Sequence, residues 1–493
     1  MRDKISLLSS RIGLDSTLLV LIGLIGAVVY IVGLGNPPLR TWDESIYMNA
    51  ARHMVQDGNW LIPHIYWTPE ALTPFLEKPP LTYWLQAISM RVFGVSKFSG
   101  RLPSAMAAIG LAWLCYSIGR DRFDRRAGFA AACILLVLPT VYLLGHSART
   151  GDTDAPLVLF GSLFVWWVWK GTSDPKWLIP GGIAAGLAVL TKGVAAGVFV
   201  IIALPLAGLY WRSYARREAI FGATAAVAVA LPWHLYAYLA RPTEFINQYV
   251  VSQVLGRSSG ELATVSGGLL PFMNYPYFSF IFTSLRYGPV MIAATVFLAV
   301  RIARRGWSGS GTELFLVWWL FSPSVVFAVV GGNNSWYVLP MVVPLAIGLG
   351  LFASEIVASI DTWLETTPLS ITPVVYVVGC LVFVVITIAA LHVAVPHQAT
   401  GEDHDQQALA ESFREAPESE RIYFTDDAAD GHRWWVFSFY LDRPQSIASP
   451  NEITSTNETA YAVVTPGEAA ASDEFTPLYK SEEFDVVAVR SVE

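Results

Sequence analysis

Charged residues are scarce in this sequence. Only 14% of its 493 residues are Asp, Glu, Lys or Arg, whereas 54% are hydrophobic. Soluble domains carry about 25% charged residues, so this composition excludes an ordinary soluble fold and favours burial in a membrane. Cysteine is scarcer still. Cys115, Cys133 and Cys380 lie far apart in apolar stretches, which excludes a disulfide framework and a cysteine metal site.

Long apolar runs recur along the chain, and each is close to the length that a helix needs to cross a hydrocarbon core of about 30 Å. Eleven such runs lie near residues 16–35, 102–119, 128–145, 154–169, 177–191, 194–210, 219–238, 287–303, 312–330, 337–357 and 371–395. The sequence therefore predicts an all-α polytopic membrane protein with about 11 transmembrane helices.

Basic residues mark alternate loops between these runs. They are Arg2, Lys4, Arg11, Arg120, Arg122, Arg125, Arg126, Lys170, Lys176, Arg212, Arg216, Arg217, Arg301, Arg304 and Arg305. Because cationic loops stay in the cytoplasm, we expect a cytoplasmic N-terminus in the cell membrane. Eleven crossings then place the C-terminus outside.

The composition changes at residue 396. Residues 396–493 hold 20 acidic and 6 basic residues, a net charge of −14. We expect a transmembrane domain over 1–395 and a small extracytoplasmic α/β domain over 396–493. Its pattern predicts a helix near 405–415, a helix or strand near 434–441, and strands at 421–425, 460–465 and 484–490. Since only 7 of the 32 basic residues are lysine, the acidic surface also indicates a high-salt, archaeal type of organism.

Two long segments, 36–101 and 239–286, are predicted to face outside, and loops of this size often carry function. Residues 79–94 are apolar but short and include Arg91. This pattern predicts a helix that lies in the membrane interface. A twelfth crossing there would invert every later loop.

Paired acids open the first outer loop. Asp43 and Glu44 follow Trp42, and a carboxylate at the membrane surface can take a proton from a hydroxyl group. An interfacial aromatic belt with solvated acids is an equally simple interpretation. In the same loop Lys78 stands between Glu77 and Pro79-Pro80. It suits a phosphate group, or it contacts lipid phosphates as an ordinary interfacial lysine.

Further charged residues face the same predicted side. Asp154 begins an apolar run and needs a partner, for which Arg149 and Lys192 are candidates. Arg257 lies in the second outer loop. A structural ion pair and a catalytic role both fit Asp154. Because these groups gather outside and not within the runs, they argue against a transporter, whose coupling residues lie near mid-membrane. A Gly-rich nucleotide-binding pattern is also missing.

The order of these motifs resembles the GT-C membrane glycosyltransferases, within the aminoarabinose-transferase and protein O-mannosyltransferase-like group. The matching segments are Trp42-Asp43-Glu44 with Tyr47, Glu77-Lys78-Pro79-Pro80-Leu81 with Tyr83, Arg101-Leu102-Pro103, Arg149 with Asp154-Ala155-Pro156-Leu157, Leu190-Thr191-Lys192-Gly193, and Trp336-Tyr337-Val338-Leu339-Pro340.

The resemblance implies a polyprenyl- or dolichyl-phosphate sugar donor and an inverting transfer to a glycan or protein acceptor, with a hexose, mannose first, as the sugar. Asp43 and Asp154 are then the catalytic acids. The implied substrate-binding residues are Glu44, Glu77, Lys78, Tyr83, Arg149, Lys192, Arg257 and Tyr337. Asp43, Lys78 and Asp154 are expected to share one pocket.

One departure concerns metals. The aminoarabinose-type enzymes have a histidine in the second outer loop where this chain has Gln253. We therefore predict no metal ligand, with a divalent metal as an open alternative, and no nucleic-acid partner. The competing functions are a membrane transporter of a small or lipid-linked solute and an inactive scaffold that presents the acidic domain.

Overall fold

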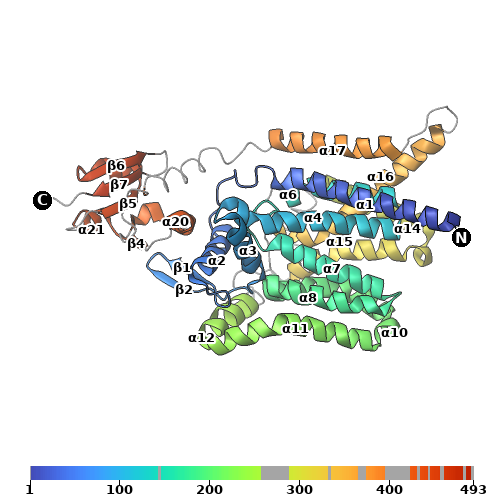
Figure 1. Cartoon of the computed structure of the whole chain (residues 1–493), viewed down its shortest axis with the longest axis horizontal. Helices are drawn as coiled ribbons and strands as arrows, with labels where there is room; N and C mark the ends of the chain where they lie inside the picture. The colour runs from blue at the N-terminus through green and yellow to red at the C-terminus, as the bar shows by residue number, and fades with distance from the viewer. Residues whose placement is uncertain are drawn as a thin grey trace. The chain divides into compact units, whose positions relative to one another are not determined.

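The computed structural model describes residues 2–142, 146–256, 288–330, 335–364, 373–394, 413, 422–429, 434–441, 445–455, 460–480 and 485–489. The chain divides into two compact units. Unit 1 comprises Met1–Val32, Glu77–Leu81 and Leu102–Val395, and unit 2 comprises Gly33–Leu76, Thr82–Arg101 and Pro396–Glu493. Figure 1 labels the helices and strands of both.

Unit 1 is built from long apolar helices that run alongside one another (Figure 1). They are α1 (Arg2–Ile31), α4 (Lys97–Arg122), α5 (Arg125–Val137), α7 (Asp154–Gly171), α8 (Leu178–Lys192), α9 (Gly197–Leu209), α11 (Arg217–Ala240), α14 (Gly288–Arg305), α15 (Gly311–Val330), α16 (Val342–Leu364) and α17 (Pro373–Ala394). Each of the eleven apolar runs falls on one of these helices, so the mostly helical fold class is confirmed.

Five stretches of the described residues are long and apolar enough to cross a membrane. They are Gly13–Ile31, Lys97–Arg122, Pro175–Leu209, Arg217–Ala240 and Trp336–Thr362, and two shorter apolar helices are Gly311–Phe327 and Val374–Ala390. The chain is thus a membrane protein with several apolar helices. The number of eleven crossings stays a prediction.

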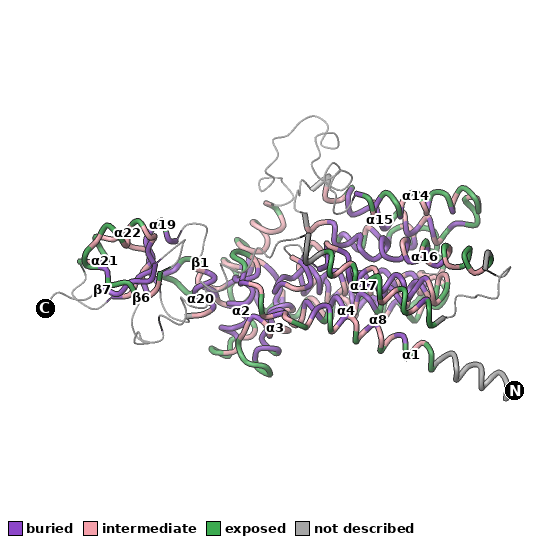
Figure 2. Tube along the Cα trace, turned by 90° about the horizontal axis from the view of Figure 1, so that it is seen from above, coloured by how far each residue is buried: buried purple, intermediate pink, exposed green. Residues whose placement is uncertain are grey.

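Small residues bring the helices of unit 1 close together. A Cβ added to Gly182 of α8 would collide with the carbonyl oxygen of Gly222 in α11, and one added to Gly350 of α16 would collide with the backbone of Ala127 in α5. Figure 2 shows buried residues along the inner faces of these helices and exposed ones along their outer faces. Exposed side chains such as Ile220 are apolar, as is typical of surfaces that contact lipid.

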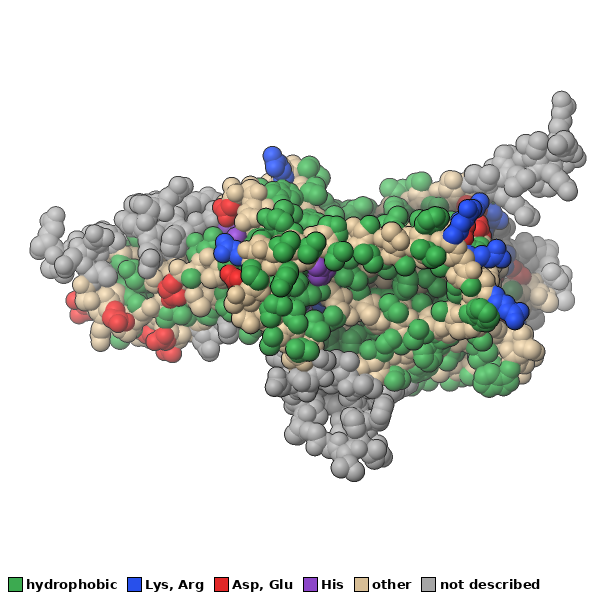
Figure 3. Space-filling view, turned by 90° about the horizontal axis from the view of Figure 1, so that it is seen from below, with side chains coloured by type: hydrophobic (Ala, Val, Ile, Leu, Met, Phe, Trp, Pro, Cys, Tyr) green, Lys and Arg blue, Asp and Glu red, His purple; other side chains and the backbone are tan. Residues whose placement is uncertain are grey.

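Ion pairs connect the helices of unit 1 at one end, where Figure 3 shows Lys and Arg side chains gathered. The pairs are Arg120–Asp15, Lys170–Asp121, Arg126–Asp361 and Arg301–Glu313, with N···O distances of 2.8–3.4 Å. They join α4 to α1, α7 to α4, α5 to α16 and α14 to α15. The basic loops predicted to alternate along the sequence therefore lie together in space, while their cytoplasmic side stays a prediction.

Unit 2 has a core that residues far apart in sequence share. Its N-terminal part contains α2 (Asp43–Asp57), the antiparallel strands β1 (His64–Thr68) and β2 (Ala71–Pro74), and α3 (Leu81–Phe93). The apolar sequence at 79–94 therefore forms a helix, and its place in the membrane interface stays a prediction. Against these elements packs α20 (Trp434–Leu441).

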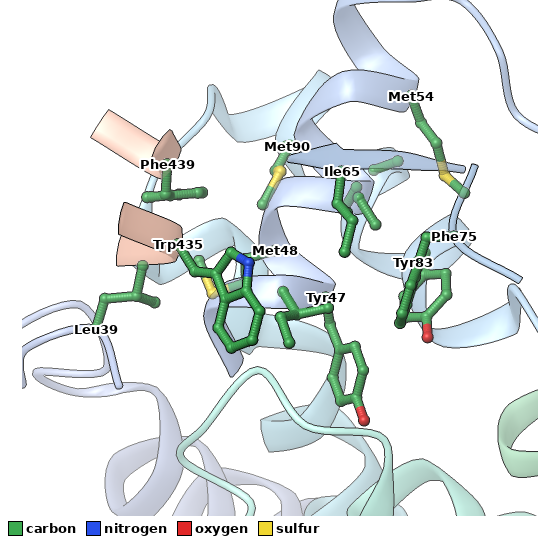
Figure 4. Close-up of a cluster of buried hydrophobic side chains, with 14 of the residues drawn as sticks. Leu39, Tyr47, Met48, Met54, Ile65, Phe75, Tyr83, Met90, Trp435 and Phe439 are labelled. Atoms are coloured by element: carbon green, nitrogen blue, oxygen red, sulfur yellow. The ribbon is translucent and has the colours of Figure 1, made fainter. Parts of the chain in front are cut away.

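Hydrogen bonds from both sides hold α20 in this core. The Asn49 side chain donates to the Trp435 carbonyl oxygen (2.6 Å), and the Trp435 indole donates to the Tyr66 carbonyl oxygen (2.9 Å). Figure 4 shows the apolar side chains around Trp435. The compact unit that contains the acidic C-terminal segment thus also contains most of the first outer loop.

A five-stranded sheet forms the rest of unit 2, in the order β4-β3-β5-β7-β6. The strands are β3 (Ile422–Phe424), β4 (Gln445–Ile447), β5 (Ala460–Val464), β6 (Phe475–Lys480) and β7 (Asp485–Val489), with the short helices α19 (Asp426–Ala429), α21 (Pro450–Thr454) and α22 (Pro466–Ala471) between them. β3 is parallel to β4 and β5, and β7 is antiparallel to β5 and β6.

The small α/β module predicted at the C-terminus is therefore present. Strands occur at all three predicted places, and the segment near 434–441 is a helix. The prediction missed β4 and β6. The helix predicted near 405–415 lies, apart from residue 413, outside the described residues.

Candidate functional site

The two acids at the start of α2 have different surroundings, although they are adjacent in sequence. Glu44 is buried, and the Arg101 guanidinium donates to both of its carboxylate oxygens (2.6 and 3.1 Å). The Arg40 backbone N–H donates to Glu44 as well (2.9 Å). Asp43, in the first turn of the helix, is only partly buried. Asp43 is thus the more accessible of the two acids, while Glu44 belongs to a buried ion pair and its predicted role in substrate binding stays a prediction.

Arg101 fixes the segment that leads into α2. Its guanidinium also donates to the backbone carbonyl oxygens of Leu34, Pro37 and Pro38 (2.7–3.1 Å). The ion pair is almost completely buried, with 1% of each side chain exposed. Removing one partner of such a pair costs about 3–5 kcal/mol because the other charge is left buried.

Strained backbone immediately precedes Asp43. Trp42 has φ 70°, which a residue with a side chain rarely adopts. The Ser45 hydroxyl and the Ile46 backbone N–H both donate to the Trp42 carbonyl oxygen (2.9 and 3.0 Å) and hold this conformation. Strain of this kind is concentrated at functional sites, which supports a functional role for the start of α2.

Tyr83, predicted to bind substrate, lies in the apolar core of unit 2. Its ring packs against Tyr47 and Phe75, with centroids 5.4 and 5.8 Å apart, and its side chain is fully buried. Figure 4 shows these rings together. The contacts explain Tyr83 as a core residue, and its role toward substrate stays a prediction.

In unit 1 a cluster of charges joins the start of α7 to the end of α8. Lys192 Nζ lies 2.7 Å from both carboxylate oxygens of Asp154, and His146 Nδ1 lies 2.8 Å from Asp154 Oδ2. The partner of Asp154 is thus Lys192, one of the two residues expected from the sequence. Both oxygens of Asp154 are engaged, so this acid orients a lysine and a histidine.

His146 contacts an aromatic ring and two carboxylates. Its ring stacks on Trp336 (centroids 3.8 Å apart, planes 19° apart), its φ is 62°, and Asp152 Oδ1 lies 3.4 Å from Nδ1. Burial alone would lower the pKa of His146, but the charges of Asp152 and Asp154 outweigh burial and raise it. The imidazole therefore favours its cationic form. Its positive charge offsets the negative charge of Asp152, while Lys192 pairs with Asp154.

Arg149 has a structural explanation. Its guanidinium donates to the carbonyl oxygens of Val29 and Val32 in α1 and its vicinity (2.7 and 3.2 Å) and lies over the Tyr142 ring. These contacts satisfy backbone groups at the end of a long apolar helix. Its predicted role in substrate binding remains a prediction.

The Glu77-Lys78 motif meets the second outer loop. Gln253 Nε2 donates to Glu77 Oε2 (2.9 Å), so the residue that replaces the expected histidine does lie beside Glu77. This contact is a hydrogen bond between an amide and a carboxylate, and the absence of a metal ligand stays a prediction. Lys78 is buried, with 6% of its surface exposed.

A π-helix over Phe245–Gly256 covers the turn that contains Lys192. A Cβ on Gly193, whose φ is 57°, would approach the Tyr249 hydroxyl to 2.6 Å. The Tyr249 hydroxyl lies 3.0 Å from His234 Nε2, and burial raises the pKa of Tyr249 to about 12. Because π-helices are rare and often occur at functional sites, this segment belongs to the candidate site of unit 1.

The other residues predicted for the site do not all lie in one compact unit of the described structure. Tyr337 stacks on Phe327 (4.4 Å), and Arg257 lies outside the described residues. Asp43 belongs to unit 2, whereas Lys78 and Asp154 belong to unit 1, and their common pocket stays a prediction. Sequence reasoning gave no role to His146, which lies only eight residues before Asp154, or to Trp336, although Trp336 begins one of the matching segments.

Comparisons with known proteins agree with the predicted resemblance. Residues 77–236 match the family model described as Dolichyl-phosphate-mannose-protein mannosyltransferase. The Undecaprenyl phosphate-alpha-4-amino-4-deoxy-L-arabinose arabinosyl transferase of Enterobacter sp. (strain 638) is 27% identical over 377 residues. That match spans 71% of this chain and 62% of the relative, which is less than two thirds of the relative's length.

Solved structures show the same fold. ArnT from Cupriavidus metallidurans in the apo state has a TM-score of 0.69 at 16% identity and covers 96% of this chain and 98% of its own. The same protein bound to Undecaprenyl phosphate has a TM-score of 0.66 at 17% identity, with 95% and 97% covered. The predicted similarity to this group is confirmed.

Proposed function

We propose that this chain, a membrane protein with the GT-C fold and related in sequence to the aminoarabinose transferases, moves a sugar from a polyprenyl-phosphate carrier to an acceptor hydroxyl group. One observation carries the proposal: the family match over residues 77–236 includes Lys78, Arg149, Asp154 and Lys192, and unit 1 holds the last two in a buried charged cluster.

The reaction needs a base and a cation. The acceptor oxygen bonds to the anomeric carbon, the bond from that carbon to the carrier phosphate breaks, and the hydroxyl proton passes to a carboxylate. Asp43 is our candidate for this carboxylate, because it is partly accessible while its neighbour Glu44 is engaged by Arg101. Lys78 is our candidate cation for the leaving phosphate.

Asp154 acts differently in this proposal. A carboxylate that contacts Lys192 and His146 with both oxygens is a poor proton acceptor, since each contact favours its charged form. We assign it a positioning role that fixes the lysine and the imidazole at the ends of α7 and α8.

The sugar is the open choice within this class. The family model is named for mannose and the arabinosyl transferase relative for 4-amino-4-deoxy-L-arabinose. Our choice of mannose from a dolichyl-type carrier, with a lipid-linked glycan or a protein as acceptor, stays a prediction. Both donors therefore belong in the test.

The test uses the full chain in lipid nanodiscs with radiolabelled dolichyl-phosphate mannose or undecaprenyl-phosphate aminoarabinose and membrane acceptors. We expect wild type to transfer label from one donor and Asp43→Asn to lose at least a hundredfold in rate. Asp57→Asn, an exposed acid at the end of the same helix, is the matched control and keeps the wild-type rate.

Lys78→Gln separates donor binding from proton transfer. We expect it to weaken donor binding, with exposed Lys176→Gln as control. Equal transfer by wild type and Asp43→Asn would remove Asp43 from the reaction. Uptake of solute into proteoliposomes without transfer from either donor would favour the transporter.

A further inference from the structure

A groove of about 800 Å³ lies on unit 1, and its lining comes from α14 and α16 alone. Pro289 and Arg304 mark its two ends on α14. They are fifteen residues apart, or about 22 Å along the helix. One leaflet of a bilayer contributes half of a hydrocarbon core of about 30 Å. The groove is therefore long enough to hold one lipid chain together with part of its head group.

Apolar side chains form both walls of this groove. Three exposed ones recur at every fourth residue on each helix, so those of one helix face the same side. They are Ile292, Val296 and Val300 of α14 and Phe352, Ile356 and Ile360 of α16, each 40–55% exposed. The Phe297 and Phe352 rings, with centroids 4.9 Å apart, connect the two helices. Such walls suit a hydrocarbon chain.

The groove is charged where α14 ends. Arg301 and Glu355 line it there and form an ion pair between the two helices. Arg301 and Arg305 also pair with the buried Glu313 of α15, each at 3.0 Å. With Arg304, three arginines face two glutamates, which leaves a net charge of +1 at this end of the groove.

Arg304 is the cation that these pairs leave over. It is exposed, lines the groove, and makes no hydrogen bond or ion pair with the residues that the structure describes. Its guanidinium offers donors in a planar fork that matches a phosphate. Trp307 follows in the 3-10 turn η4 (Trp307–Gly309) and is 76% exposed. Because exposed tryptophans are typical of the lipid head-group level, Arg304 lies at a depth suited to lipid phosphates.

This charged end is distinct from the candidate site of unit 1. Trp336, which stacks on His146, precedes the start of α16 at Val342. Ser359 lines the groove seventeen residues after Val342, or about 26 Å along the helix. The charged end also belongs to the end of unit 1 where Lys and Arg gather (Figure 3).

We infer that the groove between α14 and α16 binds a chain of an anionic phospholipid, with Arg304 in contact with the lipid phosphate. A head group of charge −1 balances the net charge of +1, whereas a zwitterionic head group leaves it unbalanced. Basic pockets between membrane helices on the cytoplasmic side bind anionic head groups in the same way. This inference does not depend on the transfer reaction.

The experiment titrates the delipidated full chain in detergent with phosphatidylglycerol or with phosphatidylcholine of the same acyl chains. Native mass spectrometry measures the bound lipid. We expect wild type to bind phosphatidylglycerol about tenfold more tightly, and Arg304→Gln to lose this preference with its charge-assisted hydrogen bonds. Arg304→Lys keeps the charge and should keep most of the preference. Arg216→Gln, an exposed arginine before α11, is the matched control and keeps the wild-type preference.

The apolar wall has its own test. Val296→Asn should weaken the binding of both lipids alike, whereas Val227→Asn, at an equally exposed position of α11, should leave it unchanged. Equal affinity of wild type for the two lipids, or an unchanged preference in Arg304→Gln, would overturn the site. Displacement of the lipid by an equal concentration of soluble glycerol phosphate would overturn the role of the apolar walls. A lipid-free dimer that Val296→Asn dissociates would assign the groove to a second copy of the chain instead.

Discussion

The pKa values of two histidines in this chain are shifted in opposite directions, because their neighbours differ in charge. Burial, together with the nearby Arg52, lowers the pKa of His53, whose Nδ1 lies 2.9 Å from the His64 carbonyl oxygen. His146 is buried too, yet Asp152 and Asp154 raise its pKa. The charge of the surroundings, and not burial alone, decides which form each imidazole prefers.

His146 should therefore make stability depend on pH on the alkaline side. Its folded-state pKa is above the unfolded value of about 6.5. Its contribution is thus complete below that pH and is lost as the pH rises through the folded-state pKa. We expect wild type to lose more thermal stability than His146→Gln between pH 6.5 and 9, measured by tryptophan fluorescence in nanodiscs.

His53→Gln is the control of opposite sign. A lowered folded-state pKa means that stability falls as the pH drops below about 6.5. His53→Gln should remove part of that acid-side loss and leave the alkaline side unchanged. Parallel pH curves for wild type and His146→Gln above pH 6.5 would show that the ion cluster does not hold the imidazole as a cation.

Residue types were predictable at this scale, but partners were not. The sequence left Arg149 and Lys192 as equal candidates for Asp154, and the fold decides for Lys192 because α7 and α8 pack together. Likewise Asp43 and Glu44 look alike in sequence. Only the position of Arg101, 57 residues after Glu44 in the chain, shows that Glu44 belongs to a buried ion pair.

At the scale of elements, glycines let the backbones of neighbouring helices in unit 1 approach closely. Gly182→Leu should force α8 and α11 apart, since its Cβ alone would collide with the Gly222 carbonyl. Overpacking of this kind costs about 1–3 kcal/mol. We expect a lower midpoint of thermal unfolding in detergent for Gly182→Leu.

Gly208→Leu is the matched control for this prediction. Gly208 lies exposed in α9, and a Cβ there would meet no heavy atom within 4 Å. It should unfold at the wild-type temperature. Equal midpoints for the two variants would mean that α8 and α11 can separate without cost.

Hydropathy located the helices of unit 1 well because a helix in lipid must satisfy its own backbone and present apolar side chains. Hydropathy predicted much less of the structure of unit 2. The bond from Trp435 to the Tyr66 carbonyl spans 369 residues, and no local pattern contains such a contact. β4, only three residues long, and β6, most of whose positions are exposed, also lack a strong periodic signal.

At the scale of the whole molecule, charge is distributed by segment. Ion pairs join α4 to α7, α5 to α16 and α14 to α16, and thereby bring the basic loops of unit 1 together. The segment from 396 onward carries a net charge of −14, although the whole chain carries only −7. Cationic loops resist translocation and acidic segments do not, so this asymmetry predicts one orientation in the membrane.

Cysteine labelling in intact cells tests that orientation. Ser173 follows α7 at the basic end of unit 1, Ser455 follows α21 in unit 2, and both are exposed. In a Cys380→Ala background, where Cys115 and Cys133 are buried, an impermeant maleimide should label Ser455→Cys directly. It should label Ser173→Cys only after permeabilisation. Labelling of Ser173→Cys in intact cells would place the cationic end outside, and both the positive-inside argument and the extracytoplasmic site would then be wrong.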